Sequence, residues 1–323
     1  MPHRLRLAAA VLLALAVLPL ARSTSLAQSD APLIRVGAAL DDQSTPLLYA
    51  VHSDMFKKAG LNVEIEKLGS GSVVAAAVAG GSLEIGKAAT YAIILAVAKG
   101  LPFTLISPIA TEVADAPDGA LLVPVNSPMK LAKDLNGKTI GVTTLQDFNM
   151  LAVEAWMDQN GGDPATVKFI ELPPPAIAAA LDAGRIDGAP VFEPVYTAAV
   201  SSGKARVGAY VYSAIAKHYI GAAMFANTAW VASHRDLVER FNRVMLEADR
   251  YVGAHESEAI PLIAQFVGVD PALLLKMHHP GRATYLAASE VQPLIDLAAK
   301  YKIIAKSFPA SQMICDCALK RRR

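Results

Sequence analysis

The sequence predicts an α/β protein of two lobes, each built on a mostly parallel sheet that helices flank. Short apolar strands alternate with helical stretches along most of the chain, and one segment recurs about a hundred residues later. Val73–Gly86 aligns with Ala176–Ala189 at an offset of 103, which places Glu84 over Asp187. This period is too long for a solenoid. We interpret it as a duplicated β/α half, with one half in each lobe.

The first third of the chain alternates strand and helix. The expected strands are Ile34–Ala39, Asn62–Leu68, Leu83–Ala89 and Phe103–Ile109, and the expected helices are Leu47–Gly60, Val73–Val78 and Tyr91–Lys99. Thr90 is a candidate N-cap of the third helix. This alternation implies right-handed crossovers. Thr111–Gly119, with three acids and a proline, is predicted to be a surface connection.

The second lobe is predicted from the same alternation. Its expected strands are Lys138–Thr143, Val167–Leu172, Asp187–Phe192 and Ala205–Val211, and its expected helices are Asn149–Asn160, Ala176–Gly184 and Val195–Ser201. Two extended apolar segments, Ala120–Asn126 and Tyr219–Ala226, are the predicted crossings. Later helical stretches should pack back on the first lobe: Arg235–His255, Glu258–Val267, Ala272–Lys276 and Glu290–Tyr301. We therefore predict lobe 1 at 34–121 and 226–310, lobe 2 at 122–225, a tail at 311–323, and a hinged cleft.

The N-terminus has the pattern of a secretory signal peptide at residues 1–27. Two arginines in Met1–Arg6 precede the apolar run Leu7–Ala21, and Ser25-Leu26-Ala27 fits a small-x-small cleavage site. The alternative is an uncleaved anchor, but this run is shorter than the roughly 20 residues that span a bilayer. We expect export to the periplasm.

Composition excludes several classes of function. The chain has a formal charge of +1, and the signal segment holds three of its arginines and no acid, so the mature chain carries +1 − 3 = −2. Without a basic stripe it predicts no nucleic-acid partner, and Lys320–Arg323 is expected to be a solvated tail. Residues 28–314 contain no cysteine, and the chain has no His-x-x-x-His or Gly-x-Ser-x-Gly motif. We expect no catalytic residue, metal or cofactor.

The two cysteines, Cys315 and Cys317, stand two positions apart. A bridge between such positions would be strained. We expect free thiols or an intermolecular link.

Ligands of open parallel sheets bind outside the carboxyl ends of the strands, where helix N-termini offer N–H donors. The candidate ligand-binding residues lie in loops at these ends: Gln43, Ser44, Ser70, Gly71, Ser72, Thr90, Tyr91, Thr144, Gln146, Phe148 and Glu193. The serines could cradle a sulfonate or carboxylate, or simply cap the helix. Tyr91 could stack on the solute or pack in the core.

Charge in these loops is mostly negative, from Asp41, Asp42, Asp147 and Glu193. A bare anion would meet repulsion unless these carboxylates face away. Glu193 could accept hydrogen bonds from an amine or aminopyrimidine, or make a structural contact beside the hinge. Lys87, the nearby base, is expected to neutralise Glu84 or Asp187.

Several segments, in this order and spacing, resemble a known family over roughly residues 34–300: Thr45-Pro-Leu-Leu-Tyr-Ala, Gly69-Ser-Gly-Ser, Gly81-Ser-Leu-Glu-Ile-Gly, Asp134-Leu-Asn-Gly-Lys-Thr-Ile-Gly-Val, Gly184-Arg-Ile-Asp-Gly-Ala and Phe192-Glu-Pro-Val-Tyr. They are similar to the periplasmic substrate-binding proteins of ABC importers for nitrate, sulfonates, taurine and thiamine-pyrimidine precursors. The resemblance implies a type II, venus-flytrap periplasmic binding protein fold that holds a ligand between its lobes.

The resemblance also implies partners and a function. We expect a monomeric, non-enzymatic solute-binding protein that delivers a small organic solute, sulfonate-, taurine- or carboxylate-like, to an inner-membrane ABC permease. The alternatives are an aminopyrimidine-binding protein, and a sensor or an enzyme on the same scaffold. A desulfinase or a thiamine-pyrimidine synthase of this fold would need cysteines that residues 28–314 lack.

Overall fold

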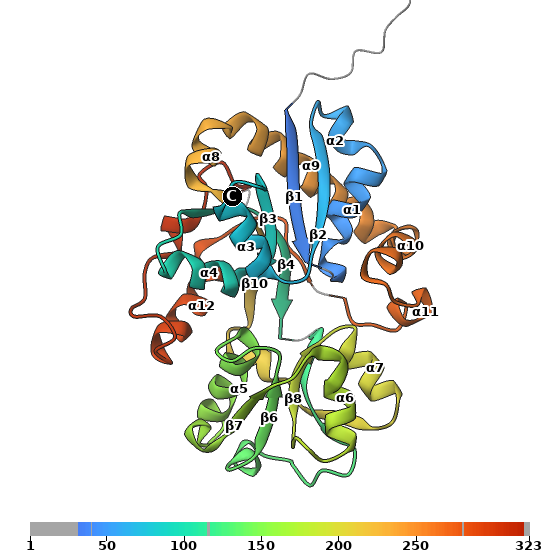
Figure 1. The fold of residues 1–323 in the computed structure, drawn as a ribbon, viewed down its shortest axis with the longest axis vertical. Coiled ribbons are helices and arrows are strands. Elements are labelled where there is room, and N and C mark those ends of the chain that lie inside the picture. Colours follow the sequence, from blue (N-terminus) through green and yellow to red (C-terminus); the bar gives the residue numbers. More distant parts are fainter. Residues whose placement is uncertain (1–31, 40, 115–116, 280, 320–323) are drawn as a thin grey trace, which may run out of the picture. The chain divides into compact units, whose positions relative to one another are not determined.

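The computed structural model describes residues 32–39, 41–114, 117–279 and 281–319; the predicted signal peptide and Lys320–Arg323 lie outside them. The larger sheet has six strands in the order β11-β4-β10-β3-β1-β2. Strand β1 (Leu33–Ala39) pairs in parallel with β2 (Asn62–Leu68) and β3 (Ile85–Ala89). The late strand β10 (His218–Asn227) lies between β3 and β4 (Phe103–Val113), antiparallel to both (Figure 1). Strand β11 (Gly281–Arg282) closes the edge beside β4.

Four early helices accompany this sheet: α1 (Thr45–His52), α2 (Met55–Lys58), α3 (Gly71–Ala79) and α4 (Thr90–Ala98). The single helix predicted at Leu47–Gly60 is wrong, because Asp54 adopts a left-handed conformation with φ 54° and separates α1 from α2. The predicted cap is also wrong. Ala89 occupies the N-cap of α4, and Thr90 is its first helical residue.

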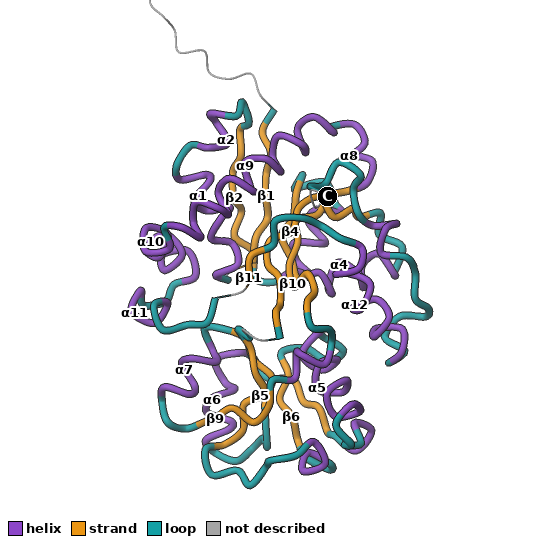
Figure 2. The backbone as a smooth tube through the Cα atoms, turned by 180° about the vertical axis from the view of Figure 1, so that it is seen from behind, coloured by secondary structure: helices purple, strands orange, loops and turns teal. Residues whose placement is uncertain are grey.

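The last third of the described chain returns to this sheet. It forms α8 (Thr228–Ser233), which the sequence did not predict, and then α9 (Arg235–Ala254), α10 (Glu256–Val267), α11 (Pro271–Leu274) and α12 (Ala288–Lys300). Figure 2 shows α1, α9 and α10 gathered on one side of β1 and β2. Stacked rings hold this layer together, with centroids 4.8 Å apart for Tyr49 and Tyr251 and 5.0 Å apart for Phe56 and Phe241. None of the helices within the described ranges is long and apolar enough to cross a membrane.

The middle of the chain forms smaller sheets. Strands β6 (Thr139–Val142) and β7 (Lys168–Glu171) pair in parallel, while β5 (Gly119–Pro124) pairs antiparallel with β8 (Ala189–Phe192) and β9 (Ala205–Ala209). A parallel bridge from Ile140 to Gly188 places β6 beside the start of β8. Three helices accompany these strands: α5 (Phe148–Gln159), α6 (Pro174–Asp182) and α7 (Val195–Ser201).

The repeat in the sequence corresponds to a repeated arrangement of strands. The order β2-β1-β3 is matched by β7-β6-β8, and an antiparallel crossing strand, β10 or β5, lies beside each set. The aligned acids also make the same contact. Glu84 Oε2 accepts the backbone N–H of Arg35 at 2.7 Å, and Asp187 Oδ2 accepts that of Thr139 at 2.9 Å. In each half, this acid fixes the beginning of the central strand.

The polar segment Thr111–Gly119 does not form the surface connection that its composition predicted. Strand β4 continues past Ile109 and pairs with β10 as far as Val113, so Thr111 and Glu112 lie inside the sheet. Asp118 is also buried, directly before β5. The outgoing crossing is therefore a continuation of β4 and contains buried acids.

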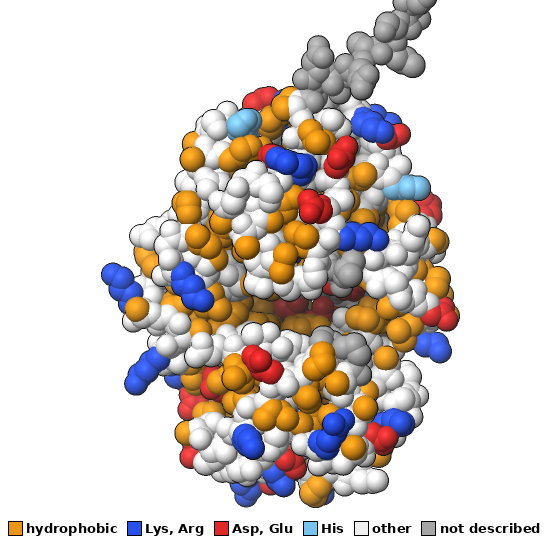
Figure 3. Space-filling model, in the orientation of Figure 1, with side chains coloured by type: hydrophobic (Ala, Val, Ile, Leu, Met, Phe, Trp, Pro, Cys, Tyr) orange, Lys and Arg blue, Asp and Glu red, His pale blue; other side chains and the backbone are white. Residues whose placement is uncertain are grey.

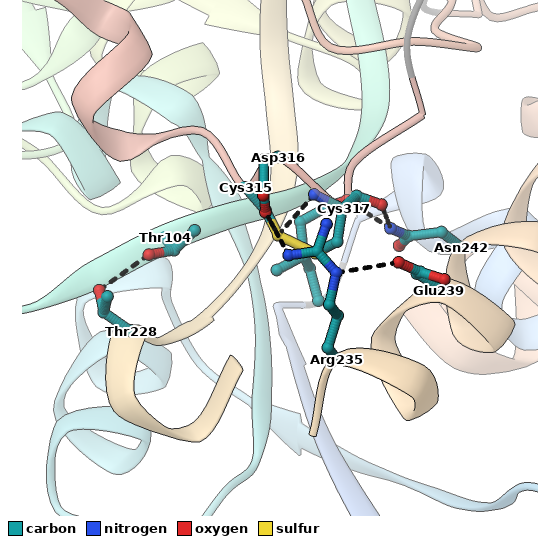
Figure 4. The surroundings of a disulfide bond; sticks show 9 residues. Thr104, Thr228, Arg235, Glu239, Asn242, Cys315, Asp316 and Cys317 are labelled. Atoms are coloured by element: carbon teal, nitrogen blue, oxygen red, sulfur yellow. Dashed lines mark hydrogen bonds and ion pairs between the residues drawn. A yellow bond between two sulfur atoms is a disulfide. The ribbon is translucent and has the colours of Figure 1, made fainter. Parts of the chain in front are cut away.

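The C-terminal segment packs against β4. The Cys315 N–H donates to the Leu105 carbonyl at 2.9 Å, and Asn242 Nδ2 donates to the Cys317 carbonyl at 3.4 Å (Figure 4). Cys315 and Cys317 form a disulfide, with their Cα atoms 5.0 Å apart. This separation lies within the ordinary range for a disulfide. The expectation of free thiols or an intermolecular link is therefore wrong.

Candidate functional site

A hollow lies where β4 and β10 run between the large sheet and the smaller ones, and acidic and hydrophobic side chains are visible at its floor (Figure 3). The loops after β3 and β6 meet at this position. The Tyr91 ring at the beginning of α4 lies 5.8 Å from the Phe148 ring at the beginning of α5. This hollow is the candidate site, because it collects strand-end loops from both halves of the repeat.

Five aromatic side chains, here named the aromatic cluster, pack together where these loops meet: Tyr91, Phe148, Phe192, Tyr212 and Tyr219. Phe148 lies at the centre, with ring centroids 6.2 Å from Phe192, 5.6 Å from Tyr212 and 5.9 Å from Tyr219. Phe192 and Tyr212 stack at 4.2 Å. Their faces offer a surface for an apolar or cationic group.

The loop before α5 holds Phe148 in place. Asp147 caps the helix by accepting the Met150 N–H at 2.9 Å, and it accepts the Thr143 hydroxyl at 2.7 Å. Gln146 adopts a left-handed conformation with φ 62°. The side chains of Thr144 and Gln146 are exposed and make no side-chain hydrogen bond to the described residues. They remain available to a solute.

Thr90 and Tyr91 are buried at the carboxyl end of β3, with exposed fractions of 0% and 2%. Within the described part of the chain, neither Thr90 Oγ1 nor Tyr91 Oη has a hydrogen-bond partner. Burial, together with the charges of Asp147 and Glu154, raises the pKa of Tyr91. Its hydroxyl therefore stays protonated and can donate. Both are buried polar atoms that still need a partner.

The serine loop acts as a helix cap. Ser70 Oγ accepts the Val73 N–H at 3.4 Å and lies 2.9 Å from Ser72 Oγ. A Cβ at Gly71 would lie 3.1 Å from the Ala88 Cβ, so the N-terminus of α3 packs closely against the end of β3, two residues before Thr90. The exposed Ser72 is left as the hydroxyl of this loop that a solute can reach.

Ser44 and Gln43 lie apart from the aromatic cluster. Ser44 is buried, and its Oγ lies 3.4 Å from Asp41 Oδ1. Gln43 lines a separate cavity against α9 and α10, together with Asp249 and His279.

Glu193 follows β8 and is buried, and both of its carboxylate oxygens are already in use. Oε1 accepts the Thr197 hydroxyl at 2.7 Å and the His278 N–H at 3.1 Å, and Oε2 accepts the Thr197 N–H at 3.0 Å. His278 belongs to the segment between α11 and β11. Glu193 was considered either as a ligand-binding residue or as a structural contact. These contacts are structural.

Lys87 does not pair with Glu84 or Asp187, and that expectation is wrong. Its ammonium pairs with Asp41, Glu84 pairs with Arg35 at 2.7 Å, and Asp187 pairs with Lys138 at 3.4 Å. The cause is the strand register. Lys87 lies opposite Ala38 near the end of β1, so the residues after that strand come within its reach.

Sequence reasoning missed two buried acids, Glu112 near the end of β4 and Asp118 directly before β5. Burial raises the pKa of Glu112 well above its ordinary value and that of Asp118 to about 6, and each group acts on the pKa of the other. The charge of Asp42 raises both pKa values further. The usable signal was their position directly before the predicted crossing Ala120–Asn126.

Known proteins share this architecture. The crystal structure of the periplasmic aliphatic sulphonate binding protein SsuA of Escherichia coli superposes with a TM-score of 0.76 at 20% identity, covering 87% of this chain and 97% of that one. The MOPS-bound alkanesulfonate-binding protein SsuA of Xanthomonas axonopodis pv. citri gives a TM-score of 0.74 at 19% identity, covering 88% and 99%. At these identities the likeness shows the fold, that of a two-lobed periplasmic binding protein.

Sequence comparison goes further. The taurine-binding periplasmic protein of Escherichia coli K12 is 28% identical over 178 residues, which are 54% of this chain and 53% of that protein. The alignment thus spans about half of this relative. The sequence profile of the NMT1/THI5-like family matches residues 41–259, which include every candidate ligand-binding residue. The chain therefore belongs to the NMT1/THI5-like family.

Proposed function

We propose that this chain is the periplasmic solute-binding component of an ABC importer and holds a small organic solute, sulfonate-, taurine- or carboxylate-like, in the hollow. The observation that carries the proposal is the pair of unpartnered buried hydroxyls, Thr90 Oγ1 and Tyr91 Oη, beside the aromatic cluster. Buried polar atoms are almost always hydrogen-bonded in native proteins. A solute supplies the missing partners.

Within this proposal, the candidate residues divide into three groups. The first group contacts the solute: Ser72, Thr90, Tyr91, Thr144, Gln146 and Phe148. Gly71 lets the N-terminus of α3 approach the end of β3 closely. Ser44, Ser70 and Glu193 hold their loops through the hydrogen bonds described above. Gln43 faces the neighbouring cavity.

The proposal also covers export, the two lobes and the membrane partner. Residues 1–27 are removed on export, and the protein acts as a periplasmic monomer. Lobe 1 comprises 34–121 and 226–310, lobe 2 comprises 122–225, and they close by hinge motion before docking on an inner-membrane permease. The protein is not an enzyme: its relatives are named as binding proteins, and residues 28–314 offer no thiol nucleophile.

The proposal is tested by titrating the purified full chain with taurine, ethanesulfonate, nitrate and propionate while recording heat and melting temperature. A bound solute at a hundredfold excess over its Kd stabilises the fold by about 2.7 kcal/mol. We expect binding of an organic solute, and at least tenfold weaker binding by Thr90→Val. Thr166→Val, at an exposed position shortly before β7, is the control. Failure of every compound to bind would contradict the proposal.

A further inference from the structure

Two buried carboxyl groups lie where the chain leaves the large sheet. Glu112 is near the end of β4 and Asp118 directly precedes β5, with exposed fractions of 7% and 4%. Each carboxyl group acts on the pKa of the other, so the two lie close together. Neighbouring carboxyl groups in a buried position do not both ionise, and the pair therefore keeps a proton. Gly221 leaves room for the Glu112 side chain, since a Cβ there would lie 2.7 Å from Glu112 Oε1.

The surroundings of this carboxyl pair are negative. Asp42 acts on both members, and Glu193 also acts on Asp118. Across residues 32–39, 41–114, 117–279 and 281–319, no lysine, arginine or histidine forms an ion pair with either carboxyl group. The cations of neighbouring segments have other partners: Lys87 pairs with Asp41, His279 with Asp42 and Glu256, and Arg282 with Asp249. An anionic group would be repelled here, and a cationic group attracted.

Unpartnered atoms indicate that a hydrogen-bonding ligand is missing at this position. Asp118 Oδ1 and Tyr219 Oη have no hydrogen-bond partner among the described residues, and Tyr219 is only 1% exposed. Tyr219 lies opposite Glu112 in the register of β10 and β4, and the charges of Glu112 and Asp118 raise its pKa in addition to burial. A group with several N–H donors satisfies these acceptors together.

The aromatic cluster suits the same group. The Tyr219 ring lies 5.9 Å from Phe148, which in turn contacts Tyr91 and Tyr212. Aromatic faces attract ammonium and amidinium groups, more strongly where water is excluded. Carboxylates beside aromatic faces therefore form a combination that selects a cation.

We propose that Glu112, Asp118 and Tyr219 form a subsite for a protonated amine of the solute. This inference rests on the proposed function and narrows it: the solute is an organic amine, such as an aminosulfonate or an amino acid, and not a bare anion. The proton shared by the two carboxyl groups passes to solvent when the ammonium binds, so the charge of the subsite stays balanced. Ser72 and Thr90 are left for the opposite, anionic end.

Matched solutes test the subsite in titration calorimetry on the full chain. The pairs are taurine with ethanesulfonate, 3-aminopropanesulfonate with propanesulfonate, and β-alanine with propionate. We expect the amine of at least one pair to bind tenfold or more tightly than its partner. In buffers of different ionisation heat, its binding should release up to one proton.

Two variants locate the effect. Glu112→Gln and Asp118→Asn keep the side-chain shape and should each weaken binding of that amine at least tenfold, while the exposed Glu64→Gln leaves it unchanged. Far-ultraviolet circular dichroism confirms that each variant is folded. Binding in which no amine exceeds the affinity of its matched partner in any of the three pairs, or unchanged amine affinity in both variants, would overturn the subsite and leave the proposed function standing. If none of the six compounds binds to the unmodified protein, both proposals fail.

Discussion

Lys87 and Asp41 form an ion pair at the carboxyl ends of β3 and β1, and the lysine side chain is only 1% exposed. Lys87 is the basic residue nearest the strand-end loops in the sequence, and this ion pair neutralises its charge. Removing one member of a buried pair leaves an uncompensated charge, which is strongly destabilising.

Asp41→Asn should therefore lower the free energy of unfolding by about 3 kcal/mol, measured by urea denaturation at pH 7. The double variant Asp41→Asn/Lys87→Met should recover most of this loss, because no buried charge remains. A single variant as stable as the unmodified protein would show that Lys87 finds another partner.

The fold was largely predictable because its signals are local. Apolar strands, glycine stops and the repeat identified β2 and α7 with their observed bounds. The repeat also aligned Glu84 with Asp187, and the structure adds that both accept a backbone N–H. The break between α1 and α2 was missed because nothing in the apolar pattern marks the left-handed Asp54.

The site was less predictable because its residues depend on long-range pairing. Strand β10 inserts between β3 and β4 and buries Glu112, more than a hundred residues earlier in the chain. The polar composition of Thr111–Gly119 had predicted a surface connection. Phe148 and Tyr91 were predicted from their strand-end positions, whereas the Tyr212 and Tyr219 rings that complete the cluster lie on segments that this rule does not reach.

The stability of the solute-free protein should depend on the protonation of the buried Asp118. Burial raises the pKa of Asp118 from 3.8 to about 6. The folded state thus holds this proton more tightly than the unfolded state. Its contribution to stability is full below about pH 4 and is lost as the pH rises through 6.

Asp118→Asn removes this dependence. Between pH 4 and pH 7, the stability of the variant relative to the unmodified protein should rise by about 2 kcal/mol, measured by urea unfolding across that range. Glu64→Gln, at an exposed position, provides the baseline. Parallel pH profiles for the unmodified protein and Asp118→Asn would show that folding does not change the pKa of Asp118.

Phe148 should support both packing and binding, because it contacts four rings, which come from α4, the end of β8, the segment after β9, and β10. Phe148→Ala should cost about 2 kcal/mol of unfolding free energy, less than for a fully buried ring because the side chain is half-buried. It should also weaken solute binding at least tenfold in calorimetry. Phe169→Ala, at a half-buried position on β7, should lose stability and keep affinity.

The disulfide between Cys315 and Cys317 should contribute little to stability. It closes a loop of very few residues, and the chain-entropy estimate for such a loop is about 1.5 kcal/mol. The segment is held to β4 independently by the Cys315 N–H and by the Asn242 amide. Reduction should therefore lower the melting temperature by only a few degrees.

The control for reduction is the double variant Cys315→Ser/Cys317→Ser. With or without reductant, it should have the melting temperature of the reduced protein. A thiol assay on the denatured, unreduced chain should find no free thiol. Two reactive thiols per chain would contradict the disulfide, and a dimer that reduction dissolves would indicate an intermolecular bridge. A fall in melting temperature much larger than that of the double variant would mean that the free thiols themselves disturb the contact with β4.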